Sequence, residues 1–313
     1  FYVIDAYNVA GEAGLGRRLS TVMQACFFAI SSVLRPDEAI KKIKEEIHNT
    51  FIKKGEKIVE MNYAAVDMAL ANMHRVEVPQ LITSLFDMPP PVRVGAPEFV
   101  RNVVGPQIAG KGDLLPVSML PVDGTYPSGT TAWEVSDLTL EVPVWEPDIC
   151  AQCGNCEIVC PHAVIRMKTY EQDSLEEAPD AFKSVRLKGR GIGPDQRYTL
   201  QVAVDNCTGC GLCVAACPVD SHPDKPGMKA INMALKDPIV DEERESWDFF
   251  KTLPQRERGD LTGMRMRETQ LMEPLFEFSG ACAGCGETPY LKLLTQLHGD
   301  QLFVANATGC SSI

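Results

Sequence analysis

Hydrophobic positions near the start of the chain recur with the period of an α-helix. Residues 36–51 begin with a proline, which suits the first turn of a helix, and continue with apolar residues at steps of three and four. The apolar run 17–34 and residues 57–74 predict two further helices on either side of this segment. Residues 1–97 are therefore predicted to be part of a mostly helical α/β domain. The apolar face of the middle helix consists of Ile40, Ile43, Ile47 and Phe51.

Proline and glycine break this pattern in the next part of the chain. They recur throughout residues 76–147, where few long helices could form. Interleaved Val, Leu and Trp residues argue against disorder, because such side chains can pack on a surface. We therefore expect residues 98–140 to form an extended connector that lies over other domains.

Composition narrows the class of protein. Eleven of the twelve cysteines follow residue 149, a clustering that indicates metal sites more than disulfides. A net charge of −12 disfavours nucleic-acid binding, which needs a basic face. No apolar run reaches the roughly 20 residues of a membrane-spanning helix. These features predict a cytoplasmic protein without a membrane segment. Because the sequence starts with Phe1 inside an apolar run, we expect a piece of a longer chain.

Two identical cysteine patterns lie in the segment 141–255. Each has the spacing Cys-x2-Cys-x2-Cys-x3-Cys-Pro, which is typical of bacterial ferredoxins with two [4Fe–4S] clusters. Zinc is the alternative, but zinc sites usually show separated Cys-x2-Cys pairs or mixed Cys and His ligands. The repeat predicts an α+β domain with a pseudo-twofold axis. The two runs are Cys150, Cys153, Cys156 and Cys160, and Cys207, Cys210, Cys213 and Cys217.

The fourth cysteine of each run is predicted to serve the cluster of the other run. Three thiolates on one tight loop can hold three corners of a cubane, whereas the fourth cysteine follows too far along the chain. One cluster is then expected on Cys150, Cys153, Cys156 and Cys217. The other is expected on Cys207, Cys210, Cys213 and Cys160.

The two runs are separated by an insertion, residues 161–206, that carries a local excess of basic side chains. It could dock an acidic electron carrier near the clusters, since complementary charge accelerates encounter. It could equally be a solvated hairpin, because runs of charge commonly face water. The basic residues are Lys183, Arg186, Lys188, Arg190 and Arg197.

A third cysteine motif follows the charged stretch 236–277, in which one helix is expected. Cys282 and Cys285 form a Cys-x2-Cys pair, and Cys310 follows in the sequence Ala-Thr-Gly-Cys-Ser-Ser. A Cys-x2-Cys pair alone is a weak signal for zinc, redox activity or part of a cluster site. With Cys310 there are three thiols, so a fourth ligand is expected from outside this sequence. Cys26 is expected to be an inert core residue in an apolar helix.

The strings Cys-Ala-Gly-Cys-Gly-Glu-Thr-Pro-Tyr (282–290) and Ala-Thr-Gly-Cys-Ser-Ser-Ile (307–313) resemble the thiamine diphosphate domain of pyruvate:ferredoxin (flavodoxin) oxidoreductases. The stretches 1–10, 14–24 and 53–62 resemble the central, coenzyme A-binding domain of the same family. The twin ferredoxin motifs stand between them in the family's order. The resemblance implies an α/β multidomain protein with an inserted α+β ferredoxin-like domain. Residues 256–313 would be a linker and the start of the thiamine diphosphate domain.

The resemblance also implies roles for individual residues. Cys282, Cys285 and Cys310 match three ligands of a third [4Fe–4S] cluster, and Glu287 and Cys310 match positions at the site of thiamine diphosphate and Mg²⁺. Ser311 and Ser312 continue that loop. Asn62 and Ser20 match positions near the coenzyme A pocket, although the family usually has Asn in place of Ser20. Without the resemblance, Asn62 is expected to lie on a helix surface.

The implied reaction is oxidative decarboxylation of pyruvate, with coenzyme A accepting the acetyl group. Electrons would pass through three [4Fe–4S] clusters to ferredoxin or flavodoxin, and the enzyme would be a homodimer. This chain would be the electron-transfer part and would need the remainder of the enzyme for turnover. Two alternatives stay open: a stand-alone ferredoxin-type electron-transfer module, and an oxidoreductase for another 2-oxoacid.

Overall fold

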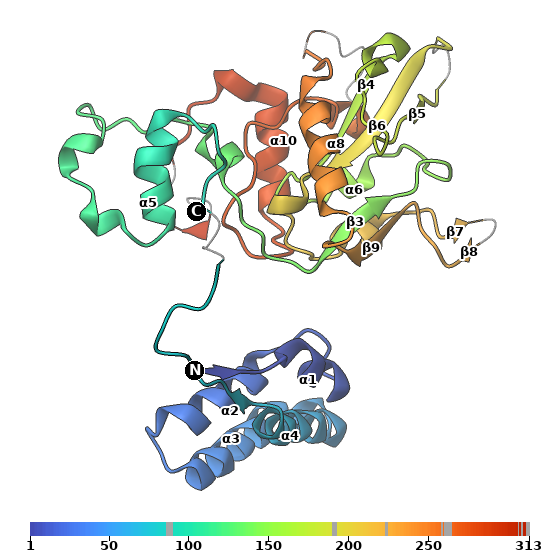
Figure 1. Ribbon diagram of the computed structural model, residues 1–313. Coiled ribbons are helices and arrows are strands. Elements are labelled where there is room, and N and C mark those ends of the chain that lie inside the picture. Colours follow the sequence, from blue (N-terminus) through green and yellow to red (C-terminus); the bar gives the residue numbers. More distant parts are fainter. Residues whose placement is uncertain are drawn as a thin grey trace. The chain divides into compact units, whose positions relative to one another are not determined.

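The computed structural model describes residues 1–85, 90–189, 193–222, 225–257, 259, 265–305, 307 and 309–310. It mixes helices with short sheets and divides into two compact units, Phe1–Met88 and Pro89–Ile313 (Figure 1). None of the helices in the described part combines the length and the apolar composition that crossing a membrane requires.

The first unit is a helical bundle closed by a small β-ribbon. The three helices expected from the apolar periodicity are present, and α4 packs against α1, α2 and α3. Pro36 begins α3, where its missing N–H is harmless, and the expected face buries Ile43 and Ile47. The elements are β1 (Tyr2–Val3), α1 (Ala6–Glu12), α2 (Ser20–Ser31), α3 (Pro36–Phe51), α4 (Glu56–Ala71) and β2 (His74–Arg75), with β1 antiparallel to β2.

The second unit begins with a small helical region, where an extended connector was expected. Residues 100–104 form a π-helix that continues directly into α5 (Gly105–Ile108). Val100 and Val104 stand four apart and bury one face against Val92 and Trp133. Pro97 precedes these turns and Pro106 stands at the start of α5, so the prolines did not prevent helix formation. The expectation of an extended connector was therefore wrong for residues 98–108.

A two-fold repeat of strand, cysteine loop, short helix and strand forms the centre of this unit (Figure 1). The first strand of each half pairs antiparallel with the last strand of the other half, as a pseudo-twofold axis requires: β3 pairs with β9, and β6 pairs with β4. The first half contains β3 (Glu141–Trp145), α6 (Asn155–Ile158) and β4 (Ile165–Glu171), and the second contains β6 (Gln196–Val202), α7 (Leu212–Ala216) and β9 (Ile231–Leu235).

The insertion between the cysteine runs contains β4 and β6. It also adds β5 (Val185–Arg186), which pairs with the edge of β6 that faces away from β4. A second short hairpin, β7 (Ser221–His222) with β8 (Lys225–Pro226), precedes β9. In the described part of the chain, three α-helices follow the repeat: α8 (Val240–Thr252), α9 (Met266–Thr269) and α10 (Thr288–His298).

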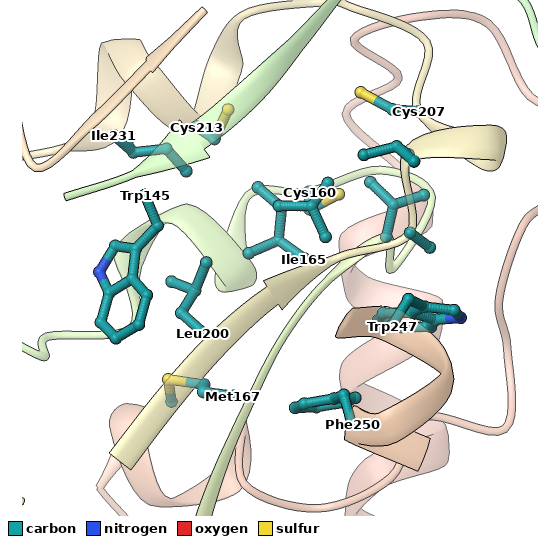
Figure 2. Packing of buried hydrophobic residues seen from close by; sticks show 14 of the residues in the cluster. Trp145, Cys160, Ile165, Met167, Leu200, Cys207, Cys213, Ile231, Trp247 and Phe250 are labelled. Carbon is teal, nitrogen blue, oxygen red and sulfur yellow. The ribbon is translucent and has the colours of Figure 1, made fainter. Parts of the chain in front are cut away.

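Helix α8 belongs to the core of the repeat. Its Trp247 and Phe250 rings stack with centroids 5.3 Å apart, and both are buried against β4 and β6 (Figure 2). Lys168 of β4 donates from Nζ to the carbonyl oxygens of Phe250 and Leu253, at 3.0 and 2.6 Å. The carbonyl of Phe250 also accepts from the N–H of Leu253. Because the last carbonyls of a helix have no N–H partners in a following turn, the ammonium group caps the end of α8 from inside the fold. The helix expected in this charged stretch is therefore confirmed.

Candidate metal centres

The two cysteine loops have the same backbone design. Each leaves a strand and enters a short helix through a glycine with positive φ, Gly154 at 78° and Gly211 at 75°. In the first loop, the N–H of Gln152 points at Cys150 Sγ with an N–S distance of 3.3 Å. In the second, the N–H of Gly209 points at Cys207 Sγ at 3.4 Å. Such N–H to sulfur contacts stabilise a thiolate that ligates iron.

The eight cysteines of the repeat line two separate cavities, four in each. The first cavity is lined by Cys150, Cys153, Cys156 and Cys217, and the second by Cys207, Cys210, Cys213 and Cys160. The two cavities are about equal in size. This is the grouping that the sequence spacing predicts.

The crosswise grouping follows from the packing of the two short helices. Helices α6 and α7 contact each other across the pseudo-twofold axis. Cys160 follows α6 and Cys217 ends α7, so each is carried to the cavity of the opposite loop. Within the described residues, no three His, Cys, Asp or Glu side chains gather closely enough to hold a single metal ion. The thiols are instead distributed around the walls of the two cavities.

The rest of each wall is largely apolar. Trp145, Tyr198 and Leu200 line the first cavity, and Val164, Ile165 and Met233 line the second. Figure 2 shows Cys160, Cys207 and Cys213 in the same buried cluster as Trp145, Ile165 and Leu200. Burial raises the pKa of both Cys207 and Cys213 to about 12, so these thiols hold their protons at neutral pH. An incoming metal must therefore displace the protons before the sulfurs can bind it.

Unpartnered polar atoms in the walls fit an occupant that accepts hydrogen bonds. Trp145 Nε1, at the first cavity, is buried and has no hydrogen-bond partner. Thr208 Oγ1, at the second cavity, is in the same situation. Sulfide and thiolate sulfur are weak acceptors that could satisfy these donors. The residues present therefore suit [4Fe–4S] clusters, and the four cysteines of each cavity would hold them.

The third cysteine motif forms a surface loop at the start of α10. Cys282 is exposed, and Cys285 is partly exposed. The backbone N–H groups of Glu287 and Thr288, at the beginning of α10, lower the pKa of Cys285. Cys310 is exposed too, and among the described residues it joins no group of three metal-binding side chains. Ser311 and Ser312 lie outside the described residues, and a third cluster on these cysteines stays a prediction.

The loop of the third motif packs directly against the second cysteine loop. A Cβ built on Gly284 would lie 4.0 Å from Cys210 Cβ. Further back, the N–H of Phe278 donates to the carbonyl oxygen of His162 at 2.9 Å, and His162 Nδ1 lies 3.1 Å from the carbonyl oxygen of Ser279. The second cavity is therefore the one that neighbours the third motif.

The candidate coenzyme A residues lie in the first unit. Ser20 is exposed at the first position of α2. Asn62 is 4% exposed, so the expectation of a helix-surface residue was wrong. Its Oδ1 accepts from Thr21 Oγ1 at 2.9 Å, and its Nδ2 donates to the carbonyl oxygen of Ile58 at 2.8 Å. Asn62 thus joins α4 to α2, and a role in coenzyme A binding stays a prediction.

We expect Asn62→Ala to lower the free energy of unfolding of the first unit by about 1–3 kcal/mol, because it leaves the buried hydroxyl of Thr21 unpaired. Asn72→Ala is the matched control: Asn72 makes the same bond to the carbonyl four residues earlier, at 2.9 Å, but is exposed. Its replacement should change the free energy by less than about 0.5 kcal/mol. Native-state hydrogen exchange of the α2 and α4 amides measures both. Equal effects of the two substitutions would contradict a stabilising role for the Thr21 bond.

Most basic residues of the insertion bind the fold. Lys183 Nζ donates to the carbonyl oxygen of Trp145 at 2.9 Å, and Lys188 Nζ donates to that of Cys150 at 2.7 Å. Arg197 Nη2 donates to the carbonyl oxygen of Ser184 at 2.7 Å. Arg186 is exposed, and Arg190 lies outside the described residues. Docking of a carrier on these five residues stays a prediction, and one of them, Lys188, also binds the insertion to the first cysteine loop.

Sequence reasoning missed Gln152, which connects that loop to the insertion. Gln152 is 1% exposed, with Nε2 donating to the carbonyl oxygen of Arg186 at 2.9 Å and Oε1 accepting from the N–H of Lys188 at 2.8 Å. It has a positive φ of 54° and occupies the position that Gly209 occupies in the second loop. The internal repeat held this signal: a large polar residue stands where the other half has glycine.

Glu157 and Lys292 also escaped the sequence patterns. Glu157 follows Cys156 and is fully buried, and burial raises its pKa to about 8. Lys292 of α10 is buried beside it and donates from Nζ to the carbonyl oxygen of Glu157. This contact ties the helix of the third motif to α6 of the first loop.

A polar cavity lies beside the first cavity. Among the described residues, Arg256, Arg265 and Arg267 line it together with one acid, Glu268. Its wall also includes Gln152 and, on the insertion, Leu187, Gly189 and Gly193. Tyr198 lines both this arginine cavity and the first cavity. An anionic group bound here would thus be one side chain away from the first set of four thiols.

Three family models match successive parts of the chain. One described as pyruvate ferredoxin/flavodoxin oxidoreductase matches residues 1–72, one described as a domain of unknown function matches residues 86–134, and one described as a 4Fe-4S dicluster domain matches residues 149–221. Curated relatives match over the whole chain. The pyruvate-flavodoxin oxidoreductase of Nostoc sp. is 51% identical and that of Rhodospirillum rubrum 46% identical. The pyruvate:ferredoxin oxidoreductase of Moorella thermoacetica is 42% identical. Each alignment covers 100% of this chain and 26% of the relative, so the chain spans about a quarter of their length.

Proposed function

Because this chain is homologous over its whole length to one segment of the pyruvate-flavodoxin oxidoreductases, we propose that it is the electron-transfer segment of a coenzyme A-dependent pyruvate oxidoreductase. The complete enzyme would convert pyruvate and coenzyme A to acetyl-CoA and carbon dioxide, releasing two electrons. The observation that carries the proposal is the pair of four-cysteine cavities, with the third cysteine loop packed against one of them.

The contacts of the third loop suggest the order of electron flow. Electrons would enter from a third cluster held by Cys282, Cys285, Cys310 and a ligand outside this chain. The second cavity would receive them, because Cys210 contacts the Gly284 loop. The first cavity would follow, since α6 and α7 hold the two cavities side by side. Apolar walls would keep water from the clusters and thus help to set low reduction potentials.

Ferredoxin or flavodoxin is the proposed acceptor, and the arginine cavity beside the first cavity is the proposed place of contact. Both carriers are proposed here as proteins with acidic surfaces, which a site of three arginines and one glutamate would attract. The insertion forms one wall of this cavity, so its predicted docking role and the arginines belong to the same surface.

We expect Arg265→Gln to slow oxidation of the dithionite-reduced chain by flavodoxin several-fold at low salt, because it removes an exposed charge from the cavity rim. The difference from the unmodified chain should vanish at high salt. Arg35→Gln, with an 88% exposed side chain in the first unit, is the control and should have no effect. Stopped-flow absorbance measures the rates. A slowing that persists at high salt, or an equal slowing with a neutral dye, would contradict electrostatic docking at this cavity.

Thiamine diphosphate with Mg²⁺, and coenzyme A, are the proposed organic partners of the complete enzyme. Glu287, Cys310, Ser311 and Ser312 are proposed near thiamine diphosphate, which would supply the decarboxylation chemistry. Ser20 and Asn62 are proposed near coenzyme A. We further propose that the complete enzyme is a cytoplasmic homodimer. In this chain, part of a coenzyme A-binding domain would be followed by the ferredoxin-like domain and by the start of a thiamine diphosphate domain. The similarity of residues 1–72 and of the third motif favours this enzyme over a stand-alone ferredoxin.

Metal analysis of the anaerobically purified chain tests the proposal. We expect about eight iron and eight sulfide per chain from the two cavities, and a dithionite-reduced EPR signal. Zinc without sulfide would refute electron transfer.

This chain alone should show no pyruvate- and coenzyme A-dependent dye reduction, because it is one segment of the homologous enzymes. Such turnover by the isolated chain would contradict the assignment of catalysis to other segments.

A further inference from the structure

Residues 90–141 contact the second cysteine loop closely, and the family model that covers most of them is described as a domain of unknown function. The segment closes on itself near its two ends. Val92 forms an antiparallel bridge with Glu134, and the N–H of Arg93 donates to the carbonyl oxygen of Trp133 at 2.9 Å. Its small apolar core holds these ends together. These contacts bring Arg93 close to residues 133–134, so that Arg93 and residues 134–141 lie on the same side of the segment.

Two hydrogen bonds join that surface to the residues immediately before Cys207. Asn206 Nδ2 donates to the carbonyl oxygen of Glu134 at 3.1 Å. The N–H of Asp137 donates to the carbonyl oxygen of Asp205 at 2.8 Å. The entry of the chain into the second cysteine loop is thus fixed from outside the repeat.

A buried carboxylate adds a charged link at the same place. The Asp205 side chain is 6% exposed and receives Arg244 of α8 through Nη2 at 2.9 Å and through Nε at 3.0 Å. Arg93 Nη2 reaches the other oxygen, Oδ2, at 3.3 Å, and Lys236 Nζ lies 3.8 Å from Oδ1. Arg93 Nη1 also lies 3.9 Å from Asp248 on α8. Arg93 therefore bridges the segment, the cysteine loop and α8.

Further along, the segment lies against the middle of the loop. A Cβ on Gly209 would lie 2.2 Å from Thr139 Oγ1 and 3.2 Å from the carbonyl oxygen of Glu141. The segment therefore contacts residues 205–206, just before Cys207, and also Gly209, just after it. The described contacts of the first cysteine loop are of another kind, since the insertion supports it through Gln152 and Lys188.

We propose that residues 90–141 act as a clamp on the Cys207 loop, with Arg93 and Asp205 as the positioning pair that fixes the second set of four thiols. This inference rests on the proposed function, in which those thiols hold a cluster. A loop held in place keeps its sulfurs at the positions that a cubane needs and keeps water out. The cation of Arg93 also stabilises an added electron, so the clamp influences the reduction potential of that cluster.

The test compares how fast the thiols of the two cysteine loops become accessible to alkylation. Arg93→Gln in the whole chain is exposed to an iron chelator under anaerobic conditions, and free thiols are alkylated at intervals and located by mass spectrometry. We expect labelling of Cys207, Cys210 and Cys213 to accelerate several-fold, while Cys150, Cys153 and Cys156 keep their rate. An EPR-monitored titration should show one of the two potentials lowered. Arg93→Lys should restore both properties in large part.

Arg101→Gln, an exposed arginine on the π-helix of the same segment, is the matched control and should change neither site. Asn206→Ala removes only the bond to Glu134 and should reproduce the selective labelling even if Arg93→Gln fails to fold. Equal acceleration at both sites, or none at either in a folded variant, overturns the clamp and leaves the proposed function intact. An unmodified chain that binds no iron overturns both.

Discussion

Cys217→Ser should remove the cluster of the first cavity and leave the second, lowering iron from about eight to about four atoms per chain. Cys217 lines the first cavity together with three thiols of a loop more than 60 residues earlier in the sequence. Serine is a poor iron ligand, so three thiolates would remain for four irons, too few to hold the first cubane. Alkylation should then label Cys150, Cys153 and Cys156, while Cys207, Cys210 and Cys213 stay protected.

Two comparisons make this result decisive. Cys26→Ala removes a cysteine that is buried in the first unit and lines neither cavity, so about eight iron atoms should remain. Cys160→Ser should give the mirror pattern, with the second loop labelled and the first protected. If Cys217→Ser exposed the thiols of its own run instead, the crosswise grouping would be wrong.

Gly209→Ala should abolish the second cluster and destabilise the repeat by about 2–4 kcal/mol. Two costs add: a non-glycine residue at a φ of 63° is strained, and its Cβ would lie 2.2 Å from Thr139 Oγ1 and 3.0 Å from Thr139 Cβ. The backbone of the loop must therefore move away from residues 139–141, which also displaces Cys207 and Cys210. Chemical denaturation and iron analysis measure the two effects.

Gly211→Ala is the matched control in the same loop. Its φ is 75°, but no atom lies within 4 Å of the added Cβ, so only the strain of about 1–2 kcal/mol applies. This variant should keep both clusters. Combining Gly209→Ala with Thr139→Ala should recover part of the lost stability, since the nearest clashing atom is removed. No recovery would show that strain, and not the contact with Thr139, causes the defect.

Local patterns in the sequence carried the metal chemistry and the helices well. The spacing of eight cysteines predicts the same sets of four that line the two cavities, because loop length alone limits which thiols can share a cubane. Helix α3 was predictable from Pro36 and its apolar period. Each of these patterns is a spacing between residues only a few positions apart, and sequence reasoning is strongest for such short-range patterns.

The failures depended on contacts between distant residues. Asn62 is buried because Thr21, 41 positions away, supplies a partner for its amide. Residues 98–108 are helical because Val92 and Trp133 cover their apolar face, which no local pattern indicates. Lys183 and Lys188 looked like a free basic surface, yet both bind carbonyl oxygens near the first cysteine loop. Polar side chains gain a role only when the fold brings a partner to them.

The crosswise grouping has a consequence for the order in which the chain can mature during synthesis. Cys160 is translated before the second loop, so the second set of thiols is complete as soon as Cys213 leaves the ribosome. The first set is complete only with Cys217, which follows its third thiol, Cys156, by 61 residues. The first loop is therefore made early and completed last, and during that interval its three thiols are the ones most open to oxygen and to competing metals.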